Sequence, residues 1–140
     1  MTVHSRTRTA SRALTVWVVL LAVAVANGAL REAWLIPLTG GLTGHQLSTL
    51  TLSAAIFLVT WLTIGWIGPA TQAEARLVGL GWVALTLAFE FGAGYFVFGK
   101  TWVELLADYD VMSGRIWILV LATTSWSPPI AAALRLRPNP

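Results

Sequence analysis

The sequence predicts an all-α polytopic membrane protein with four transmembrane helices and a short amphipathic helix in the third loop. Hydrophobic residues make up 56% of the chain and charged residues 11%, which is outside the usual balance of soluble domains. Four apolar runs approach the ~20 residues that a membrane-spanning helix requires, and none alternates like an outer-membrane strand. Together they form one transmembrane domain over residues 1–140, with helices at about 13–30, 47–66, 77–98 and 116–134.

Composition also argues against several classes of function. The chain has no cysteine, which removes disulfides, thiolate catalysis and the common zinc and iron–sulfur ligand sets. The net charge of +3 could suit nucleic acid, but most of the arginines lie in the two tails rather than on a soluble surface. His45 and Ser48 are close in sequence, yet no third group is arranged to orient them for hydrolysis. We therefore expect no nucleic-acid partner, no cofactor, no bound metal and no enzymatic activity.

The first apolar run follows a basic, polar tail that we expect to be disordered up to the bilayer. Tail and run together have the outline of a secretory signal, and residues 24–26 would serve as a small-residue cleavage site. The apolar run is longer than a usual signal core and continues to Leu30. We therefore expect the run to be retained as the first helix.

Charge predicts the orientation of the helices. Six of the nine lysines and arginines lie in the tails or in the loop near Glu74, and three lie in the other two loops. Because cytoplasmic loops are enriched in these residues, both termini are predicted to be cytoplasmic. The aromatic residues Trp34, Tyr95, Trp102, Tyr109 and Trp117 then fall at the outer ends of the helices, where such rings anchor a protein at the interface.

The three loops differ in character. The second, residues 67–76, is short, and it predicts that the helices before and after it are antiparallel neighbours. The first, residues 31–44, contains one proline and three glycines and predicts an irregular connection. The third contains Thr101 and Glu104 in the spacing of a capping box, followed by apolar residues on one helical face. It predicts an amphipathic surface helix at about 101–109.

Glu90 is the main candidate for a functional residue, because it places a carboxylate inside the apolar run 77–98. Such a group is costly in lipid and needs a partner or a proton. We expect it to pair with Arg31, Arg115 or Asn27, or to be protonated.

Two stripes accompany Glu90. On its own helix, Ala84, Ala88 and Gly92 form a small-residue stripe, interpreted as helix packing within the chain or as an oligomer contact. On the second helix, polar residues share one face and are interpreted either as hydroxyls bonded to their own backbone or as a track for an ion or proton. These residues are His45, Thr49, Ser53, Thr60 and Thr63.

Most of the charge outside the tails collects at the predicted outer side, near Glu90. It is interpreted as a solvated surface with structural pairs or as a small polar pocket, and a divalent ion held by His45 and carboxylates is the least favoured alternative. The candidate binding residues are Glu90, Arg31, Asn27, His45, Asp108 and Arg115.

Four segments carry a resemblance to a known family: 27–32, 44–51, 85–110 and 114–117. The family motif G-x-x-R lies in the first of them, and F-E-x-x-x-G, G-x-x-W and D-Y lie in the third. With these motifs the chain resembles a family of small uncharacterised bacterial four-helix membrane proteins. The resemblance implies an integral membrane location but no activity, and we expect that membrane to be the bacterial inner membrane. The residues that carry the resemblance are Gly28, Arg31, Phe89, Glu90, Gly94, Gly99, Trp102, Asp108 and Tyr109.

The function expected from these features is non-enzymatic. The outward-facing polar cluster around Glu90 would bind a ligand or partner, or would pair charges for structure alone. The alternative is a small proton- or cation-coupled transporter that acts as an oligomer. The expected partners are the lipid bilayer and either further copies of the chain or a larger membrane complex.

Overall fold

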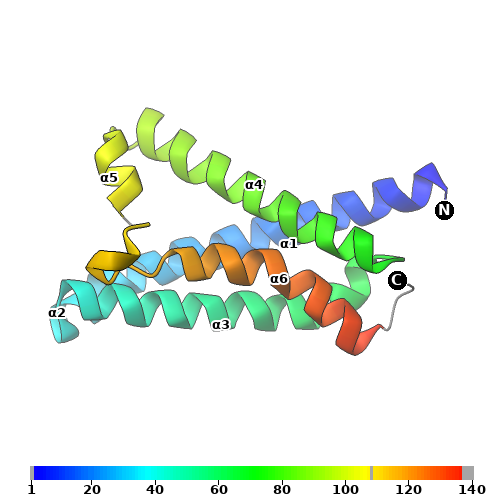
Figure 1. The fold of residues 1–140 in the computed structure, drawn as a ribbon, viewed down its shortest axis with the longest axis horizontal. Helices are drawn as coiled ribbons and strands as arrows, with labels where there is room; N and C mark the ends of the chain where they lie inside the picture. The colour runs from blue at the N-terminus through cyan, green and yellow to red at the C-terminus, as the bar shows by residue number, and fades with distance from the viewer. Residues whose placement is uncertain (1, 108, 137–140) are drawn as a thin grey trace.

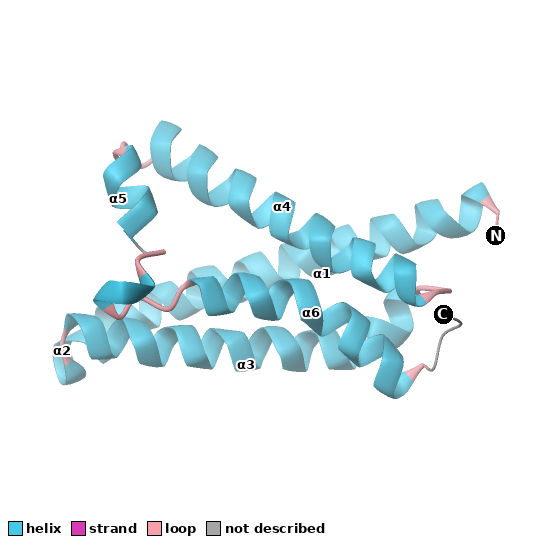
Figure 2. Ribbon diagram, in the orientation of Figure 1, coloured by secondary structure: helices cyan, strands magenta, loops and turns pink. Residues whose placement is uncertain are grey.

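The computed structural model describes residues 2–107 and 109–136, and this part of the chain is helical without any strand (Figures 1 and 2). The all-α fold class is therefore confirmed. The elements are α1 (Val3–Leu30), the π-helical turn η1 (Arg31–Leu35), α2 (Ile36–Thr39), α3 (Gly41–Ile67), α4 (Gln72–Phe96), α5 (Trp102–Ala107), the 3₁₀ turn η2 (Val111–Ser113) and α6 (Ile118–Arg135).

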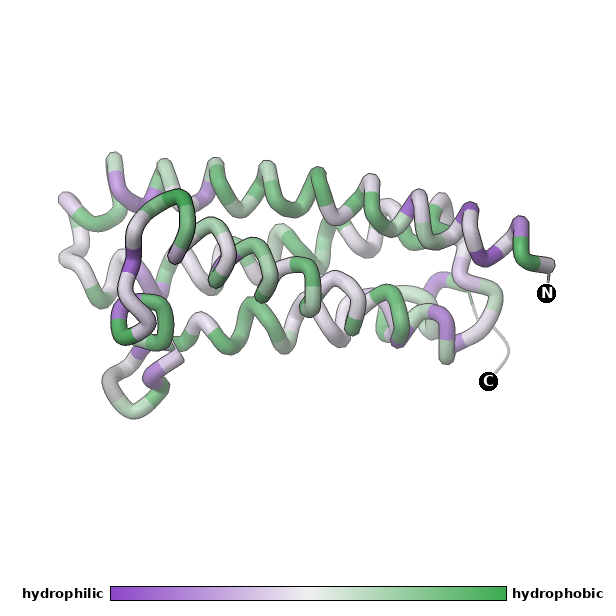
Figure 3. Tube along the Cα trace, turned by 90° about the horizontal axis from the view of Figure 1, so that it is seen from above, coloured by the Kyte–Doolittle hydropathy of each residue, from purple (hydrophilic) through white to green (hydrophobic). Residues whose placement is uncertain are grey.

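Three helical stretches are long and apolar enough to cross a membrane, as expected for a membrane protein. They are Val3–Thr39, Gly41–Ile67 and Gln72–Phe96. Hydrophilic residues concentrate toward the two ends of the bundle (Figure 3). We call the end that carries η1, α2, α5 and η2 the α5 end. The other end, where α1 begins and α6 ends, is the basic end, with Arg6, Arg8, Arg12, Arg76 and Arg135.

The tail before the first apolar run is helical, which corrects the prediction that it is disordered. Thr2 caps α1 by accepting the N–H of Ser5, and the Thr7 hydroxyl donates to the Val3 carbonyl at 3.0 Å. Further along, Arg12 donates to the Trp66 carbonyl at 2.7 Å and lies over the Trp66 ring. Capping and this anchor to α3 stabilise a helix that extends beyond the apolar run.

The first loop is also more regular than predicted. Helical backbone continues through η1 and α2, and the chain reverses only at Gly40, whose φ of 91° suits a residue without a side chain. Pro37 lies inside this continuous helical stretch, just after the π-helical turn η1, and its missing N–H removes one backbone hydrogen bond. After the reversal, Gly44 packs against the backbone of Ile36. The irregular connection expected from proline and glycine content is therefore a single turn.

The capping box in the third loop is confirmed. The Thr101 hydroxyl accepts the Glu104 N–H at 3.2 Å, and the Glu104 carboxylate accepts the Thr101 N–H at 3.1 Å. The helix it begins, α5, is shorter than the expected 101–109 and ends at Ala107.

The packing centres on α6, which makes extensive contacts with both α3 and α4. The connection Gly68–Thr71 makes α3 and α4 antiparallel, as predicted, but α6 rather than α4 is the main neighbour of α3. Figure 1 shows α4 diverging from the other helices toward the α5 end. Where α4 crosses α1, the indole of buried Trp82 donates to the Ala13 carbonyl at 2.8 Å.

The contact between α4 and α6 depends on the absence of a side chain at Gly79. A Cβ there would lie 2.0 Å from the Ser125 carbonyl oxygen. That carbonyl has no helical donor four residues on, because Pro129 lacks an N–H. Pro128 and Pro129 also explain why α6 bends in Figure 1 while remaining helical to Arg135.

We predict that Gly79→Ala lowers the free energy of unfolding by about 1–3 kcal/mol, because the added methyl group forces two backbones apart. Gly81→Ala on the same helix is the control, since a Cβ there has no atom within 4 Å beyond its chain neighbours and the backbone of its own helix. Thermal unfolding in detergent measures both variants. Equal melting temperatures for the two variants would contradict this account of the α4–α6 contact.

Candidate functional site

A cavity of about 210 Å³ lies at the α5 end, between the diverging part of α4 and the segments that face it. Its walls combine aromatic rings with a few charged groups. The lining residues that bear on function are Arg31, His45, Glu90, Phe91, Phe98, Lys100, Tyr109 and Trp117. We call this space the Glu90 cavity.

Glu90 is half-buried and lies six residues before the end of α4, about 9 Å along the helix axis. The indole N–H of Trp117 donates to one carboxylate oxygen at 2.8 Å. The hydroxyl of Tyr109 donates to the other oxygen in a short hydrogen bond. Each oxygen accepts one of these two hydrogen bonds, so the geometry fixes the orientation of the carboxylate at the cavity.

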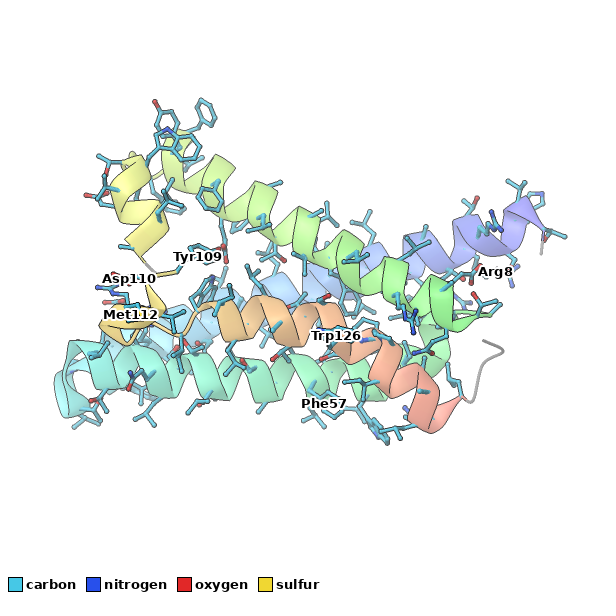
Figure 4. The ribbon with its side chains drawn as sticks, viewed as in Figure 1. Arg8, Phe57, Tyr109, Asp110, Met112 and Trp126 are labelled. Atoms are coloured by element: carbon cyan, nitrogen blue, oxygen red, sulfur yellow. The ribbon has the colours of Figure 1, made fainter. Side chains whose placement is uncertain are left out.

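Ring contacts hold both donors in place. Phe91, the residue after Glu90, stacks on Tyr109 with ring centroids 6.1 Å apart and on Trp102 at 5.9 Å. His45 meets Trp117 edge to face at 6.3 Å. Figure 4 shows the Tyr109 side chain pointing from the segment after α5 toward α4. The donors therefore come from the third loop and the start of α6, and their rings contact rings of α3 and α4.

Two of the residues expected to pair with Glu90, Arg31 and Asn27, have other side-chain contacts. Arg31 lines the same cavity, and its side chain lies 3.3 Å from the carboxylate of its neighbour Glu32. Asn27 on α1 accepts a short hydrogen bond from Ser48 on α3. Arg115 lies in the segment between η2 and α6, where its backbone N–H donates to the Asp110 carbonyl at 3.2 Å. Asp108 lies outside the described residues.

The structure thus brings Glu90, Arg31 and His45 to one cavity and places Asn27 in a separate contact between α1 and α3. Within residues 2–107 and 109–136, no group of three His, Asp or Glu side chains is close enough to hold a metal ion.

A second cavity, of about 180 Å³, lies on the other side of Glu90. Its walls are mainly apolar and come from α1, α3, α4 and α6. Phe89, Glu90 and Trp117 line both cavities, so the carboxylate stands at the boundary between them. The Thr86 hydroxyl at this second cavity accepts the Trp17 indole N–H at 3.1 Å.

The polar stripe of the second predicted helix is largely engaged with its own backbone. Thr49, Thr60 and Thr63 each donate to the carbonyl four residues back, at 2.7–2.9 Å. Such bonds satisfy hydroxyls in an apolar helix, so they support the packing interpretation over a continuous track. The small-residue stripe on α4 does not pack within the chain, because Ala84 and Ala88 are exposed and a Cβ at Gly92 has no atom within 4 Å beyond its chain neighbours and the backbone of its own helix.

Sequence reasoning missed Tyr109 and Trp117 as partners of the carboxylate and interpreted both as interfacial anchors. Their indole and phenol groups do suit an interface, so composition alone cannot separate the two roles. Tyr109 was nevertheless one of the residues on which the family resemblance rests.

Comparison of the chain with protein-family models, curated proteins and solved structures finds no match. The function is therefore argued from the geometry of the site.

Chemically, the Glu90 cavity joins a hydrogen-bond acceptor to aromatic walls. The carboxylate can accept from an ammonium, amide or hydroxyl group, and ring faces attract cations. Arg31 and Lys100 line the same cavity and favour an anionic group nearby. The adjoining apolar cavity can take a hydrocarbon portion.

Proposed function

We propose that this chain is a non-enzymatic integral membrane protein that binds a small amphipathic ligand at Glu90. The observation that carries this proposal is the position of the carboxylate, which lines both a polar, aromatic cavity and an apolar one. The cavities measure about 210 and 180 Å³, so they suit a ligand smaller than a typical drug. The donor group of the ligand would lie at Glu90 and its hydrocarbon part in the apolar cavity.

The proposal includes four transmembrane helices in a bacterial inner membrane, with both termini cytoplasmic and the Glu90 cavity facing outward. α1 begins and α6 ends at the same end of the molecule, which supports an even number of crossings (Figure 1). The arginines of the basic end support a cytoplasmic position for it. We also retain the proposed membership of the family of small uncharacterised bacterial four-helix membrane proteins, and α5 as a surface helix.

Because the chain has no cysteine, single cysteines can test this topology directly. We predict that a membrane-impermeant maleimide added outside cells labels Met112→Cys, since Met112 is 97% exposed at the α5 end. Ser5→Cys and Leu136→Cys should react only after the membrane is permeabilised. Labelling of Leu136→Cys from outside would show that α6 does not cross.

For ligand binding, we predict that purified protein binds n-hexylammonium and that Glu90→Gln weakens this binding about tenfold or more, because a charge-assisted hydrogen bond is lost. Isothermal titration calorimetry measures the affinities, and n-hexanol shows how much a neutral donor contributes. Glu74→Gln is the matched control, since Glu74 lies at the basic end and lines neither cavity. Equal affinity in wild type and Glu90→Gln would rule out the carboxylate as the binding group.

Coupled transport is the second candidate, favoured by the two cavities that meet at Glu90. It requires uptake of the same amine into proteoliposomes under a pH gradient, abolished by Glu90→Gln. Binding without uptake supports a binding protein. A purely structural role gives neither binding nor uptake, together with a lower melting temperature for Glu90→Gln.

A further inference from the structure

A cavity larger than the two beside Glu90 lies away from that residue. It is a groove of about 540 Å³ between α1 and α4, toward the basic end. Ala13, Val78 and Trp82 form a buried floor, while Leu14 and Leu77 are exposed along its sides. The hydrogen bond from the Trp82 indole to the Ala13 carbonyl joins α1 and α4 at this floor, and the cavity lies beside it between the two helices.

The polar end of the groove is formed by Arg6, Thr71 and Glu74. Glu74 accepts the N–H of Ala70 at 2.9 Å, so its carboxylate is held by the connection that precedes α4. Among the described residues, the Arg6 side chain has no hydrogen-bond or ion-pair partner. This differs from Arg12 on the same helix, which donates to the Trp66 carbonyl.

The dimensions of the groove match one leaflet. On α4 it runs from Ala73 to Leu85, which is about 18 Å of helix, and half of a ~30 Å hydrocarbon core is about 15 Å. Arg6 lies seven residues before Ala13, where the apolar run begins, or about 10 Å beyond it along the axis. That places the guanidinium at the depth of lipid headgroups.

From this geometry we infer that the groove is a binding site for one anionic phospholipid of the leaflet at the basic end. One acyl chain lies on the floor made by Ala13, Val78 and Trp82, and the phosphate contacts Arg6. A guanidinium is well suited to phosphate because it presents a planar set of donors. The site is independent of ligand binding at Glu90.

Two matched pairs of variants separate an effect at the groove from a general effect of adding a leucine or removing a charge. Gly81 lines the groove and Gly92 does not, yet a Cβ at either position has no atom within 4 Å beyond its chain neighbours and the backbone of its own helix. Gly81→Leu therefore fills the groove, and Gly92→Leu adds the same side chain elsewhere on α4. Arg6→Gln and Arg8→Gln remove the same charge two residues apart, but only Arg6 lines the groove.

Native mass spectrometry of the purified protein, released from micelles with phosphatidylglycerol or phosphatidylcholine of equal chain length, tests the inference. We expect wild type to retain one phosphatidylglycerol with a preference of roughly fivefold over phosphatidylcholine. Gly81→Leu should lose the retained lipid of both kinds, and Arg6→Gln should lose only the preference. Gly92→Leu and Arg8→Gln should behave as wild type, and circular dichroism on heating confirms that each variant is folded.

Three results would overturn the inference. Unchanged lipid retention by folded Gly81→Leu would show that the lipid lies elsewhere. An equal loss of preference in Arg8→Gln and Arg6→Gln would show a general effect of net charge. A dimer that Gly81→Leu dissociates would show that a second copy of the chain occupies the groove.

Discussion

Toward the α5 end, α4 runs away from the other helices, and the Glu90 carboxylate is the group that links it to α6 and to the third loop. Trp117 and Tyr109 each donate to one of its oxygens. Leu105 adds an apolar contact by packing against Gly94, where a Cβ would come within 2.5 Å of it. The cavities beside Glu90 exist because α4 diverges, and their common wall is the carboxylate with its aromatic neighbours. A carboxyl group, which is expensive to bury in lipid, therefore joins α4 to the elements that face it at this end of the structure.

The two ends of the molecule use different chemistry. At the basic end, Arg12 and Arg135 donate to carbonyls near the end of α3 and lie over the rings of Trp66 and Trp61. These contacts let long cationic side chains cover apolar rings while their charges stay near the headgroups. At the α5 end, aromatic donors instead meet a carboxylate within the helical region. One end is thus suited to contact with anionic lipid and the other to recognition of a small ligand.

Hydrophobic run length was enough to predict an all-helical membrane protein, and Glu90 was identified because a carboxylate in an apolar run is rare. Capping chemistry also predicted Thr101 and Glu104 correctly, since both partners lie within one turn. Prediction failed where contacts between residues far apart in the sequence determine the local structure. The tail is helical partly because Arg12 reaches Trp66, and α6 lies between α3 and α4 because Gly79 admits the Ser125 carbonyl. Likewise, the partners of Glu90 come from a loop whose path depends on tertiary packing, which local periodicity does not encode.

A double-mutant cycle between Glu90 and Tyr109 tests the central claim most directly. Glu90→Met keeps the length of the side chain and removes the acceptor, and Tyr109→Phe keeps the ring stacked on Phe91 and removes the donor. Thermal or denaturant unfolding of both single variants and the double variant gives the coupling energy, with Tyr95→Phe in place of Tyr109→Phe as the control. The hydrogen bond to a charged group predicts a coupling of about 1.5–3 kcal/mol for Tyr109 and none for Tyr95. Effects of Glu90→Met and Tyr109→Phe that add to within about 0.5 kcal/mol would contradict the link between α4 and the third loop.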